Sequence, residues 1–534
     1  MPQPPDPPFT SGADTHVLTE RGAQHHPSFE GSHRAADASG CSGVASGDAH
    51  PVERGAQALI LAIDQGTTGT TCLVVDDGLR AVGRGYREIR QSFPQPGRVE
   101  HDPEEIWASV EQTAAEALAA AGIGARELAA IGITNQRETT VVWERPTGRA
   151  VHPAIVWQDR RTAGRCAALP PLLIRERTGL VPDPYFSATK LEWILARTEL
   201  PARELAFGTI DSWLVWKLTA GGAHVTDVTN ASRTMLLDLA AGAWDDELLG
   251  LFGVDRAVLP DVVGSSGLIG EAVLLGARVP IAGVAGDQQA ALFGQGCFAP
   301  GEAKATYGTG TFVLAALGEG PGTPAEGLLT TAAAVPPGRA PQYAAEGAVL
   351  VGGAALQWLR DGLGVIESAA ESERLATSVE STDGVVFVPA LTGLGSPQWQ
   401  PDARGLISGL TRGTTRAHLV RAALEAVAHQ VADVLDALPL EVGVLRADGG
   451  ATANGFLMQL QADLAGCPVE VAADADATAL GVSALAGLAV GTWSGPDEVA
   501  ALIRRGARYE PRMSSDDVEH MRGEWREALR RVLL

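Results

Sequence analysis

Three short segments rich in glycine and threonine have the residue types that a phosphate group needs. They span residues 64–71 (DQGTTGTT), 306–311 (TYGTGT) and 448–454 (DGGATAN), and each adjoins an apolar run. Glycine lets the backbone approach a ligand closely, and free N–H groups form a concavity that binds anions. One such segment alone is typical of an ordinary turn. Three in one chain favour a phosphate or nucleotide site, although none matches a Walker A loop.

Two acidic residues stand where apolar runs end. Asp64 follows the run 59–63, and its carboxylate could hold a magnesium ion through water. Asp287 follows the run 283–286 and could accept a proton from a hydroxyl nucleophile. Aspartate is also a common helix N-cap, so spacing alone leaves both interpretations of Asp287 open.

Side chains suited to a small polyol follow another apolar run. Arg137 and Glu138 offer hydrogen-bond donors and acceptors, although the same pair is also typical of a weak surface ion pair. Trp157 stands before Arg160 and Arg161 and could form an apolar wall. From the residues alone, a place in the hydrophobic core is the better interpretation of Trp157.

Alternating strand and helix patterns would position these side chains. Apolar runs at residues 59–63, 72–75 and 130–134 predict buried strands, and the first two should form a hairpin. A helix should begin with Asp102 as its N-cap, Pro103 in the first helical position and Glu105 completing a capping box. Apolar spacing predicts further helices over residues 419–435 and from Asn454 onward.

This alternation predicts an α/β fold with mixed sheets. Segments that run from a strand into Asp and Gly occur in both halves of the chain, which suggests two related domains facing one cleft. The composition changes only weakly between them, and the boundary is predicted near residues 294–300.

The composition limits the kinds of partner. The chain has 534 residues and a formal net charge of −23, which argues against general binding to nucleic acid or to anionic membranes. Its five cysteines are scattered and no apolar run is long enough to span a membrane, so a cytoplasmic protein is expected. Residues 1–57 are rich in Pro, Gly and His and are predicted to be a disordered N-terminal tail.

Longer segments extend these motifs along most of the chain. They are LAIDQGTTGTT (61–71), VEHDPEEIW (99–107), GITNQRETTVVW (132–143), AIVWQDRRT (154–162), DPYFSATK (183–190), VTDVTNASRTML (225–236), GDQQAALFGQ (286–295), TYGTGTF (306–312), QWLRD (357–361) and DGGATANGFLMQ (448–459). Together they resemble the FGGY family of carbohydrate kinases over roughly residues 58–530. Within the family, NQRETT and DPYFS are similar to members that act on glycerol rather than on a pentulose or hexulose.

The resemblance implies a fold and an activity. The fold would be α/β, with two actin-like (ribonuclease-H-like) domains and a ligand cleft between them. The N-terminal domain, residues 58–297, would bind glycerol and phosphate, and the C-terminal domain, residues 298–534, would bind the nucleotide. The activity would be ATP-dependent phosphorylation of glycerol to sn-glycerol 3-phosphate, with ATP and Mg²⁺ as cofactors. Members of the family commonly form homodimers or homotetramers.

Site residues follow from the family pattern, position by position. Asp287 would be the general base. The glycerol site would contain Arg137, Glu138, Trp157, Tyr185, Asp287, Gln288 and Phe312. The nucleotide site would contain Thr67, Thr68, Gly69, Thr309, Gly353, Gln357, Gly450 and Asn454. Asp64 would hold Mg²⁺.

Two other functions fit part of the pattern. A sibling FGGY kinase for another polyol or a ketose would keep the same loops and the same base. An actin-like or Hsp70-like ATPase would share the phosphate loops but has no need for Arg137, Glu138 or Gln288. Turnover of glycerol against a panel of sugars separates a glycerol kinase from a sibling FGGY kinase. ATP-dependent sedimentation without glycerol phosphorylation would support the actin-like or Hsp70-like ATPase.

Overall fold

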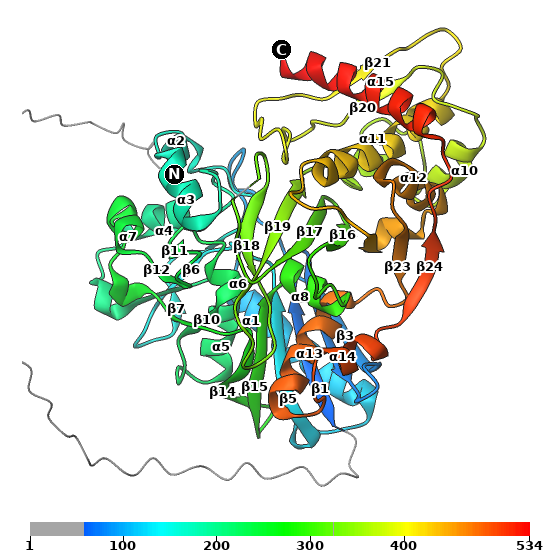
Figure 1. The fold of residues 1–534 in the computed structure, drawn as a ribbon. Coiled ribbons are helices and arrows are strands. Elements are labelled where there is room, and N and C mark those ends of the chain that lie inside the picture. Colours follow the sequence, from blue (N-terminus) through cyan, green and yellow to red (C-terminus); the bar gives the residue numbers. More distant parts are fainter. Residues whose placement is uncertain (1–57, 324) are drawn as a thin grey trace, which may run out of the picture. The chain divides into compact units, whose positions relative to one another are not determined.

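Two mixed β-sheets form the framework of the protein (Figure 1). The structure is a computed structural model and describes residues 58–323 and 325–534. The predicted tail, residues 1–57, lies outside the described residues. The six-stranded sheet has the order β14 (Ser266–Leu274), β15 (Ala277–Gly286), β5 (Leu128–Asn135), β1 (Leu59–Gln65), β2 (Gly69–Val75) and β3 (Ala81–Glu88). The seven-stranded sheet has the order β18 (Leu329–Ala333), β19 (Gln342–Val349), β17 (Thr311–Gly318), β16 (Glu302–Tyr307), β22 (Val444–Asp448), β23 (Val469–Ala472) and β24 (Arg505–Tyr509).

Both sheets share one strand order at their centre. In the first sheet, β1, β2 and β3 form an antiparallel meander, β5 pairs parallel to β1, and β15 pairs parallel to β5. In the second sheet, β16, β17 and β19 form the meander, β22 pairs parallel to β16, and β23 pairs parallel to β22. This repeated arrangement is the ribonuclease-H-like topology expected for each half. Residues 58–297 are called the first half below, and residues 298–534 the second half.

Helices and small sheets connect these strands. The longer helices are α1 (Pro103–Ala121), α3 (Pro171–Thr178), α4 (Ala188–Leu195), α5 (Ile210–Leu218), α8 (Asp287–Gly294), α9 (Ala354–Asp361), α11 (Arg416–Asp436), α12 (Gly455–Ala465), α13 (Ala477–Val490) and α15 (Ser515–Leu533). The shorter helices are α2 (Ala163–Cys166), α6 (Val228–Ala231), α7 (Asp246–Phe252), α10 (Glu371–Thr377) and α14 (Pro496–Leu502). Small sheets pair β4 (Glu100–His101) with β8 (Ala154–Ile155), β6 (Val141–Glu144) with β7 (Arg149–Ala150) and β9 (Leu205–Gly208), β10 (Val225–Asp227) with β13 (Asp261–Val263), β11 (Leu237–Asp238) with β12 (Ala243–Trp244), and β20 (Val386–Val388) with β21 (Leu406–Ser408).

The start of α1 shows how far local sequence determines a helix end. Asp102 is the N-cap as predicted, and its side chain accepts the backbone N–H of Glu104 at 2.9 Å. Pro103 is the first helical residue, where its missing N–H costs nothing. The predicted capping box is wrong, because the Glu105 carboxylate accepts the backbone N–H of Arg90 at 3.1 Å.

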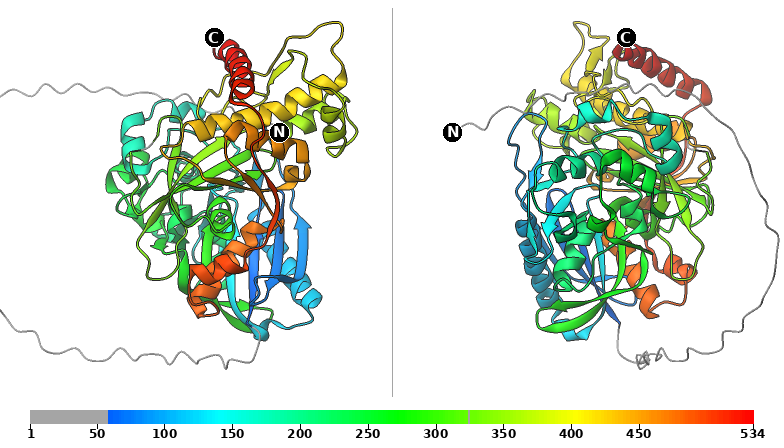
Figure 2. Two further views of the ribbon diagram at one scale, coloured as in Figure 1. Left: turned by 45° about the vertical axis from the view of Figure 1, so that its right-hand side comes forward. Right: turned by 90° about the vertical axis from the view of Figure 1, so that its left-hand side faces the viewer.

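One helix of the second half lies on the first sheet. α13 packs against β1, β5 and β15 and crosses α8, and Figure 2 shows it in orange beside the blue strands. The approach is close enough that a Cβ atom on Gly132 of β5 would lie 2.6 Å from the Val482 carbonyl oxygen of α13. Where the two helices cross, a Cβ atom on Gly481 would lie 1.9 Å from the Ala290 carbonyl oxygen. The boundary between residues 297 and 298 stays a prediction.

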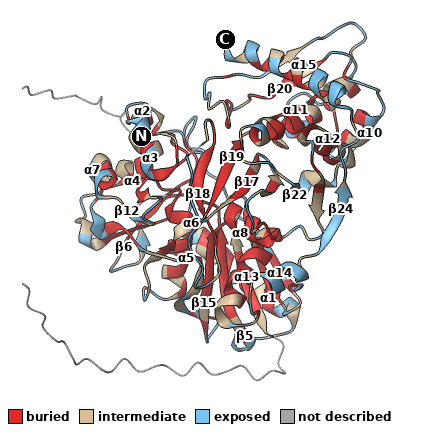
Figure 3. Ribbon diagram, in the orientation of Figure 1, coloured by how far each residue is buried: buried red, intermediate tan, exposed pale blue. Residues whose placement is uncertain are grey.

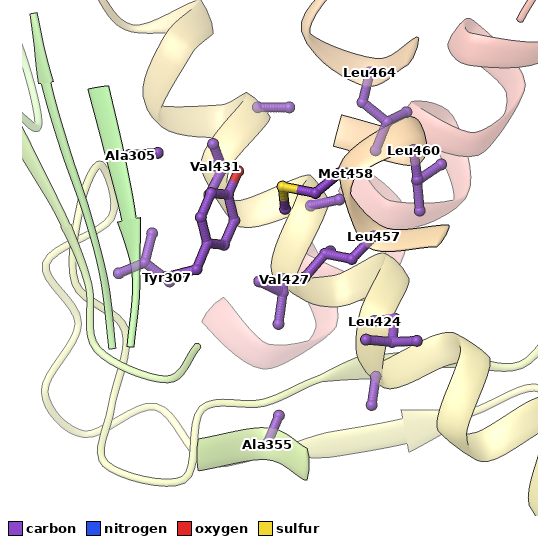
Figure 4. Close-up of a cluster of buried hydrophobic side chains, with 14 of the residues drawn as sticks. Ala305, Tyr307, Ala355, Leu424, Val427, Val431, Leu457, Met458, Leu460 and Leu464 are labelled. Atoms are coloured by element: carbon purple, nitrogen blue, oxygen red, sulfur yellow. The ribbon is translucent and has the colours of Figure 1, made fainter. Parts of the chain in front are cut away.

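Buried residues concentrate in the strands of both sheets and in the helices between them (Figure 3). In the second half, α11 and α12 pack against β16 through an apolar cluster that includes Val431 and Met458 (Figure 4). Tyr307, the last residue of β16, lies in this cluster and donates its hydroxyl to Gln461 Oε1 at 2.9 Å. This packing fixes the start of the loop 308–310. Along residues 58–323 and 325–534, no helix is long and apolar enough to span a membrane.

Candidate active site

Asp287 lies beside Arg137 at the carboxyl ends of two neighbouring strands. Since β5 and β15 pair in parallel, their C-terminal ends meet at one edge of the sheet. Arg137 follows β5, Asp287 starts α8 directly after β15, and Arg137 Nε lies 3.2 Å from Asp287 Oδ1. The N-cap of α8 is Gly286, so the interpretation of Asp287 as an N-cap is wrong. The Asp287 side chain is 29% exposed and can meet a ligand.

Arg137 belongs to a ring of four buried charges. It donates to both carboxylate oxygens of Glu346, at 2.6 and 2.9 Å. Arg233 donates to Glu346 at 2.9 Å and to Glu138 at 2.7 Å. Each of the four side chains is at most 2% exposed. The alternative interpretation, a weak surface ion pair between Arg137 and Glu138, is therefore wrong.

Burial and the neighbouring arginines shift the pKa values of the site's carboxyl groups in opposite directions, and which effect is larger differs from one group to the next. Burial alone would raise the pKa of Glu346, but Arg137 and Arg233 outweigh it and lower the pKa to about 2. For Glu138, burial outweighs the same two arginines and the pKa is raised. Burial also raises the pKa of Asp287 against the pull of Arg137. A carboxylate with a raised pKa is a better proton acceptor near neutral pH.

Three aromatic rings gather next to Arg137. The ring centroid of Trp157 lies 5.5 Å from that of Tyr185 and 6.2 Å from that of Phe312. The Tyr185 hydroxyl accepts a hydrogen bond from Arg137 at 3.3 Å. Trp157 is half-buried, so it lies at the border of the core rather than inside it. Its Nε1 donates to Thr67 Oγ1 at 2.9 Å, which links these rings to the first glycine–threonine segment.

That first segment is a tight turn between β1 and β2. The N–H of Gly66 donates to the Gly69 carbonyl oxygen at 2.9 Å, and Thr68 is exposed at the tip. A Cβ atom on Gly69 would lie 2.5 Å from the Arg87 carbonyl oxygen, so a larger residue would push the neighbouring strand away. The turn therefore keeps its backbone close to the neighbouring strand and leaves Thr68 at the surface.

Asp64, the predicted metal-binding residue, lies near the end of β1. Burial, followed by the charges of Asp287 and Asp476, raises the pKa of Asp64 to about 8. Within the described residues, no group of three or more His, Cys, Asp and Glu side chains is arranged to hold a metal by itself. Magnesium usually takes one or two carboxylates and completes its shell with water and substrate phosphates. Asp64, whose charge interacts with that of Asp287, could supply one such carboxylate, and its role as a Mg²⁺ ligand stays a prediction.

The second and third glycine segments adjoin each other and the start of α9. The N–H of Gly353 donates to the Gly308 carbonyl oxygen at 2.9 Å. A Cβ atom on Gly449 would lie 2.5 Å from the Tyr307 carbonyl oxygen, and its φ of 94° also favours glycine. The exposed residues next to these contacts include Thr309, Gln357 and Gly450.

Asn454 uses its side chain to hold the start of α12. Its Oδ1 accepts the backbone N–H of Leu457 at 2.9 Å, and its Nδ2 donates to Ser372 Oγ at 3.1 Å. The residue thus ties the third glycine segment to a helix N-terminus, whose free N–H groups favour anions. The nucleotide-binding role of this cluster stays a prediction.

Sequence profiles cover most of the described chain. The profile of the FGGY family of carbohydrate kinases, N-terminal domain, matches residues 59–294, and that of the C-terminal domain matches residues 303–490. The chain belongs to the FGGY family of carbohydrate kinases. The predicted family resemblance is thereby confirmed.

Relatives of this FGGY kinase include glycerol kinases. The glycerol kinase of Leptothrix cholodnii is 53% identical over 493 residues, which cover 89% of this chain and 99% of the relative. Glycerol kinase 2 of Thermotoga maritima is 51% identical over 489 residues, which cover 89% of this chain and 98% of the relative.

Solved structures of the family agree with the fold described above. The crystal structure of Plasmodium falciparum glycerol kinase with ADP has a TM-score of 0.83 at 35% identity, covering 90% of this chain and 99% of that chain. The xylulose kinase from Rhodospirillum rubrum has a TM-score of 0.75 at 26% identity, covering 88% of this chain and 98% of that chain. The predicted α/β fold of two domains is confirmed.

Three charged residues of this FGGY site were not predicted from the sequence. They are Arg233, Lys304 and Glu346. Arg233 lies inside the motif 225–236 but received no role. Glu346 is the only charged residue of the buried strand β19, and Lys304 is a buried charge between alanines in β16, where Glu302 is the other charged residue. A charge in a buried strand costs free energy unless it is paired, so these charges within apolar runs were the available signal.

Proposed function

We propose that this FGGY kinase transfers the γ-phosphoryl group of ATP to glycerol and forms sn-glycerol 3-phosphate and ADP. The observation that carries the proposal is the position of Asp287 beside Arg137, next to a buried ring of charges and three aromatic rings. Glycerol is favoured over a ketose because relatives named glycerol kinase are 51% and 53% identical, whereas the xylulose kinase is 26% identical.

Asp287 is the proposed general base. Within the described residues, its contacts with Arg137 Nε and with the Gln288 N–H both use Oδ1. Oδ2 is then the oxygen that takes the proton from a glycerol hydroxyl. The hydroxyl oxygen forms a bond to the γ-phosphorus, the bond from that phosphorus to the bridging oxygen breaks, and ADP leaves with the bond's electrons.

The glycerol site combines polar and apolar recognition. Arg137, Glu138, Tyr185 and Gln288 are the proposed partners of the hydroxyl groups, and Trp157 and Phe312 are the proposed wall along the carbon chain. Buried charged donors bind hydroxyl oxygens strongly because little water competes with them. The same exclusion of water would limit the hydrolysis of ATP.

The nucleotide site draws on loops from both halves. Thr67, Thr68 and Gly69 are the proposed phosphate contacts, and Thr309, Gly353, Gln357, Gly450 and Asn454 line the rest of the proposed site. Asp64 would hold Mg²⁺, which when bound neutralises phosphate charge. The proposed functional domains are residues 58–297 for glycerol and phosphate and residues 298–534 for the nucleotide, and the proposed place of action is the cytoplasm.

Steady-state turnover tests the function and the base together. Asp287→Asn should lower kcat by about 10²–10⁴-fold, because it removes the proton acceptor. Calorimetry should show ADP binding within about threefold of wild type, since nucleotide contacts remain. Asp246→Asn is a matched control, because Asp246 is also the first residue of a helix but its side chain is 87% exposed. Near-normal turnover by Asp287→Asn would remove Asp287 from its proposed role.

The substrate is tested with the wild-type protein. Glycerol should give a higher kcat/KM than each member of a panel of ketoses and other polyols. Faster turnover of a ketose would identify that ketose, and not glycerol, as the substrate. ATP hydrolysis with ATP-dependent sedimentation, and no phosphorylated polyol, would favour the filament or chaperone ATPase instead.

A further inference from the structure

Lysine is rare in this chain. Among its 41 basic residues, three are lysines, namely Lys190, Lys217 and Lys304, and the other 38 are arginines. Lys190 and Lys304 are fully buried, with 0% of their surface exposed. An ammonium is a compact cation with three rotatable donors, whereas a guanidinium is a larger planar fork. In a chain this rich in arginine, a buried lysine marks a place that suits the compact cation.

Lys304 reaches from the second half to the first. It lies in β16, and its Nζ donates to Gln288 Oε1 on α8. A second hydrogen bond from Nζ goes to Thr306 Oγ1 at 2.8 Å. Burial lowers the pKa of Lys304 to about 8, against the opposing charges of Asp448 and Asp287. The ammonium therefore lies among the carboxylates of the site and binds the residue next to the proposed base.

The chemistry of an ammonium determines how Gln288 is turned. A lysine ammonium donates hydrogen bonds and cannot accept them, so Gln288 must present Oε1 to Lys304. Because the amide is planar, its NH₂ group then points away from Lys304 with two N–H donors. Gln288 directly follows Asp287 in α8 and is 8% exposed, which leaves the side chain little room to turn.

We propose that Lys304 is a positioning residue that fixes the Gln288 amide so that its NH₂ end, and not its oxygen, meets an oxygen atom of the polyol. The proposal rests on the proposed function, in which Gln288 binds the substrate beside Asp287. A hydroxyl that accepts a hydrogen bond from Gln288 keeps its own proton for donation to a carboxylate. The fixed amide thus favours a substrate hydroxyl whose proton faces Asp287.

Two substitutions test this role, one at Lys304 and one at Gln288. Lys304→Met frees the Gln288 amide to turn, so the KM for glycerol should rise about tenfold while the KM for ATP stays within about twofold. Gln288→Glu keeps a partner for the Lys304 ammonium but removes both N–H donors. Its melting temperature should stay near wild type while its KM for glycerol also rises about tenfold. Lys217→Met, which removes a lysine bound to the exposed Glu104, is the matched control and should leave the kinetics unchanged.

A double-mutant cycle with Gln288→Ala separates positioning from simple charge neutralisation. If Lys304 acts through Gln288, the double variant Gln288→Ala and Lys304→Met should have the same kcat/KM for glycerol as Gln288→Ala alone. Additive losses, a wild-type KM for glycerol in Gln288→Glu, or equal rises in both KM values in Lys304→Met would overturn the proposal. Because Gln288→Glu keeps the buried lysine, it decides the question even where Lys304→Met does not fold.

The same series separates this proposal from the proposed function. A wild-type protein that does not phosphorylate glycerol refutes the function itself. A wild-type protein that does so, together with additive losses in the cycle, refutes only the role of Lys304.

Discussion

Glu346 holds the two arginines of the buried ring, and Glu346→Gln changes its charge but hardly its shape. In the wild type, Oε2 accepts from Arg137 at 2.6 Å, and Oε1 accepts from Arg137 and from Arg233 at 2.9 Å each. A glutamine amide has one acceptor oxygen, so its NH₂ group must face an arginine N–H whichever way it turns. At least one buried arginine donor then loses its acceptor, and the ring loses a negative charge.

Two arguments give the size of the loss. Removing one partner of a buried ion pair costs about 3–5 kcal/mol. The pKa of Glu346 lies at about 2 in the fold against a usual value of 4.5, and that shift corresponds to about 3 kcal/mol. We therefore expect Glu346→Gln to lower the free energy of unfolding by about 3 kcal/mol. We also expect kcat/KM for glycerol to fall about 100-fold, because Arg137 is no longer held beside Asp287.

The sign of the pH dependence follows from the direction of the pKa shift. Because the fold lowers the pKa of Glu346, the charged group stabilises the fold fully above its unfolded pKa of 4.5. That stabilisation is lost as the pH falls from 4.5 towards about 2. The difference in unfolding free energy between wild type and Glu346→Gln should therefore be largest near neutral pH and should shrink in acid.

Urea unfolding at several pH values and steady-state kinetics measure both effects. Glu271→Gln is the matched control, since Glu271 also lies in a strand and accepts from Arg278 at 2.9 Å, but both side chains are more than half exposed. An exposed pair of this kind contributes little to stability. Equal destabilisation by the two substitutions, or a loss in Glu346→Gln that does not change with pH, would refute the reasoning.

Two further predictions concern the nucleotide side of the site. Gly449→Ala should raise the KM for ATP and lower the free energy of unfolding by about 1–3 kcal/mol, because the new Cβ would lie 2.5 Å from the Tyr307 carbonyl oxygen at a φ of 94°. Thermal unfolding and kinetics indistinguishable from wild type would contradict this prediction. Trp157→Phe keeps an aromatic ring beside Tyr185 but removes the N–H that donates to Thr67, so the KM for ATP should rise about tenfold and the KM for glycerol much less. A larger rise in the KM for glycerol would show that Trp157 acts mainly as a wall.

The strands and turns around the site could be predicted because their signals are local. The apolar runs 59–63 and 130–134 lie in β1 and β5, and Asp102 caps α1 through a contact two residues away. Parallel pairing then brings Arg137 and Asp287 to one edge of the sheet. Residues directly after parallel strands can therefore be predicted to lie close together, because the topology places the C-terminal ends of these strands at one edge of the sheet.

The ring could not be predicted because its partners are far apart in the sequence. Arg137 and Glu346 are 209 positions apart, and Arg233 and Glu138 are 95 positions apart. No local pattern tells which glutamate will meet which arginine. The capping box failed for a similar reason, because Arg90, 15 positions earlier, takes the carboxylate of Glu105.

The balance of charge in the site indicates what a ligand must bring. Three cationic side chains (Arg137, Arg233 and Lys304) face five carboxyl groups (Asp64, Glu138, Asp287, Glu346 and Asp448). An uncompensated buried charge is costly. Burial raises the pKa values of Asp64 and Asp287, and the charges of Asp287 and Asp476 raise that of Asp64 further. Free ATP would add further negative charge, whereas ATP that carries a divalent cation adds much less. The site around Asp287, the proposed base, therefore suits a magnesium-bound nucleotide better than a free one.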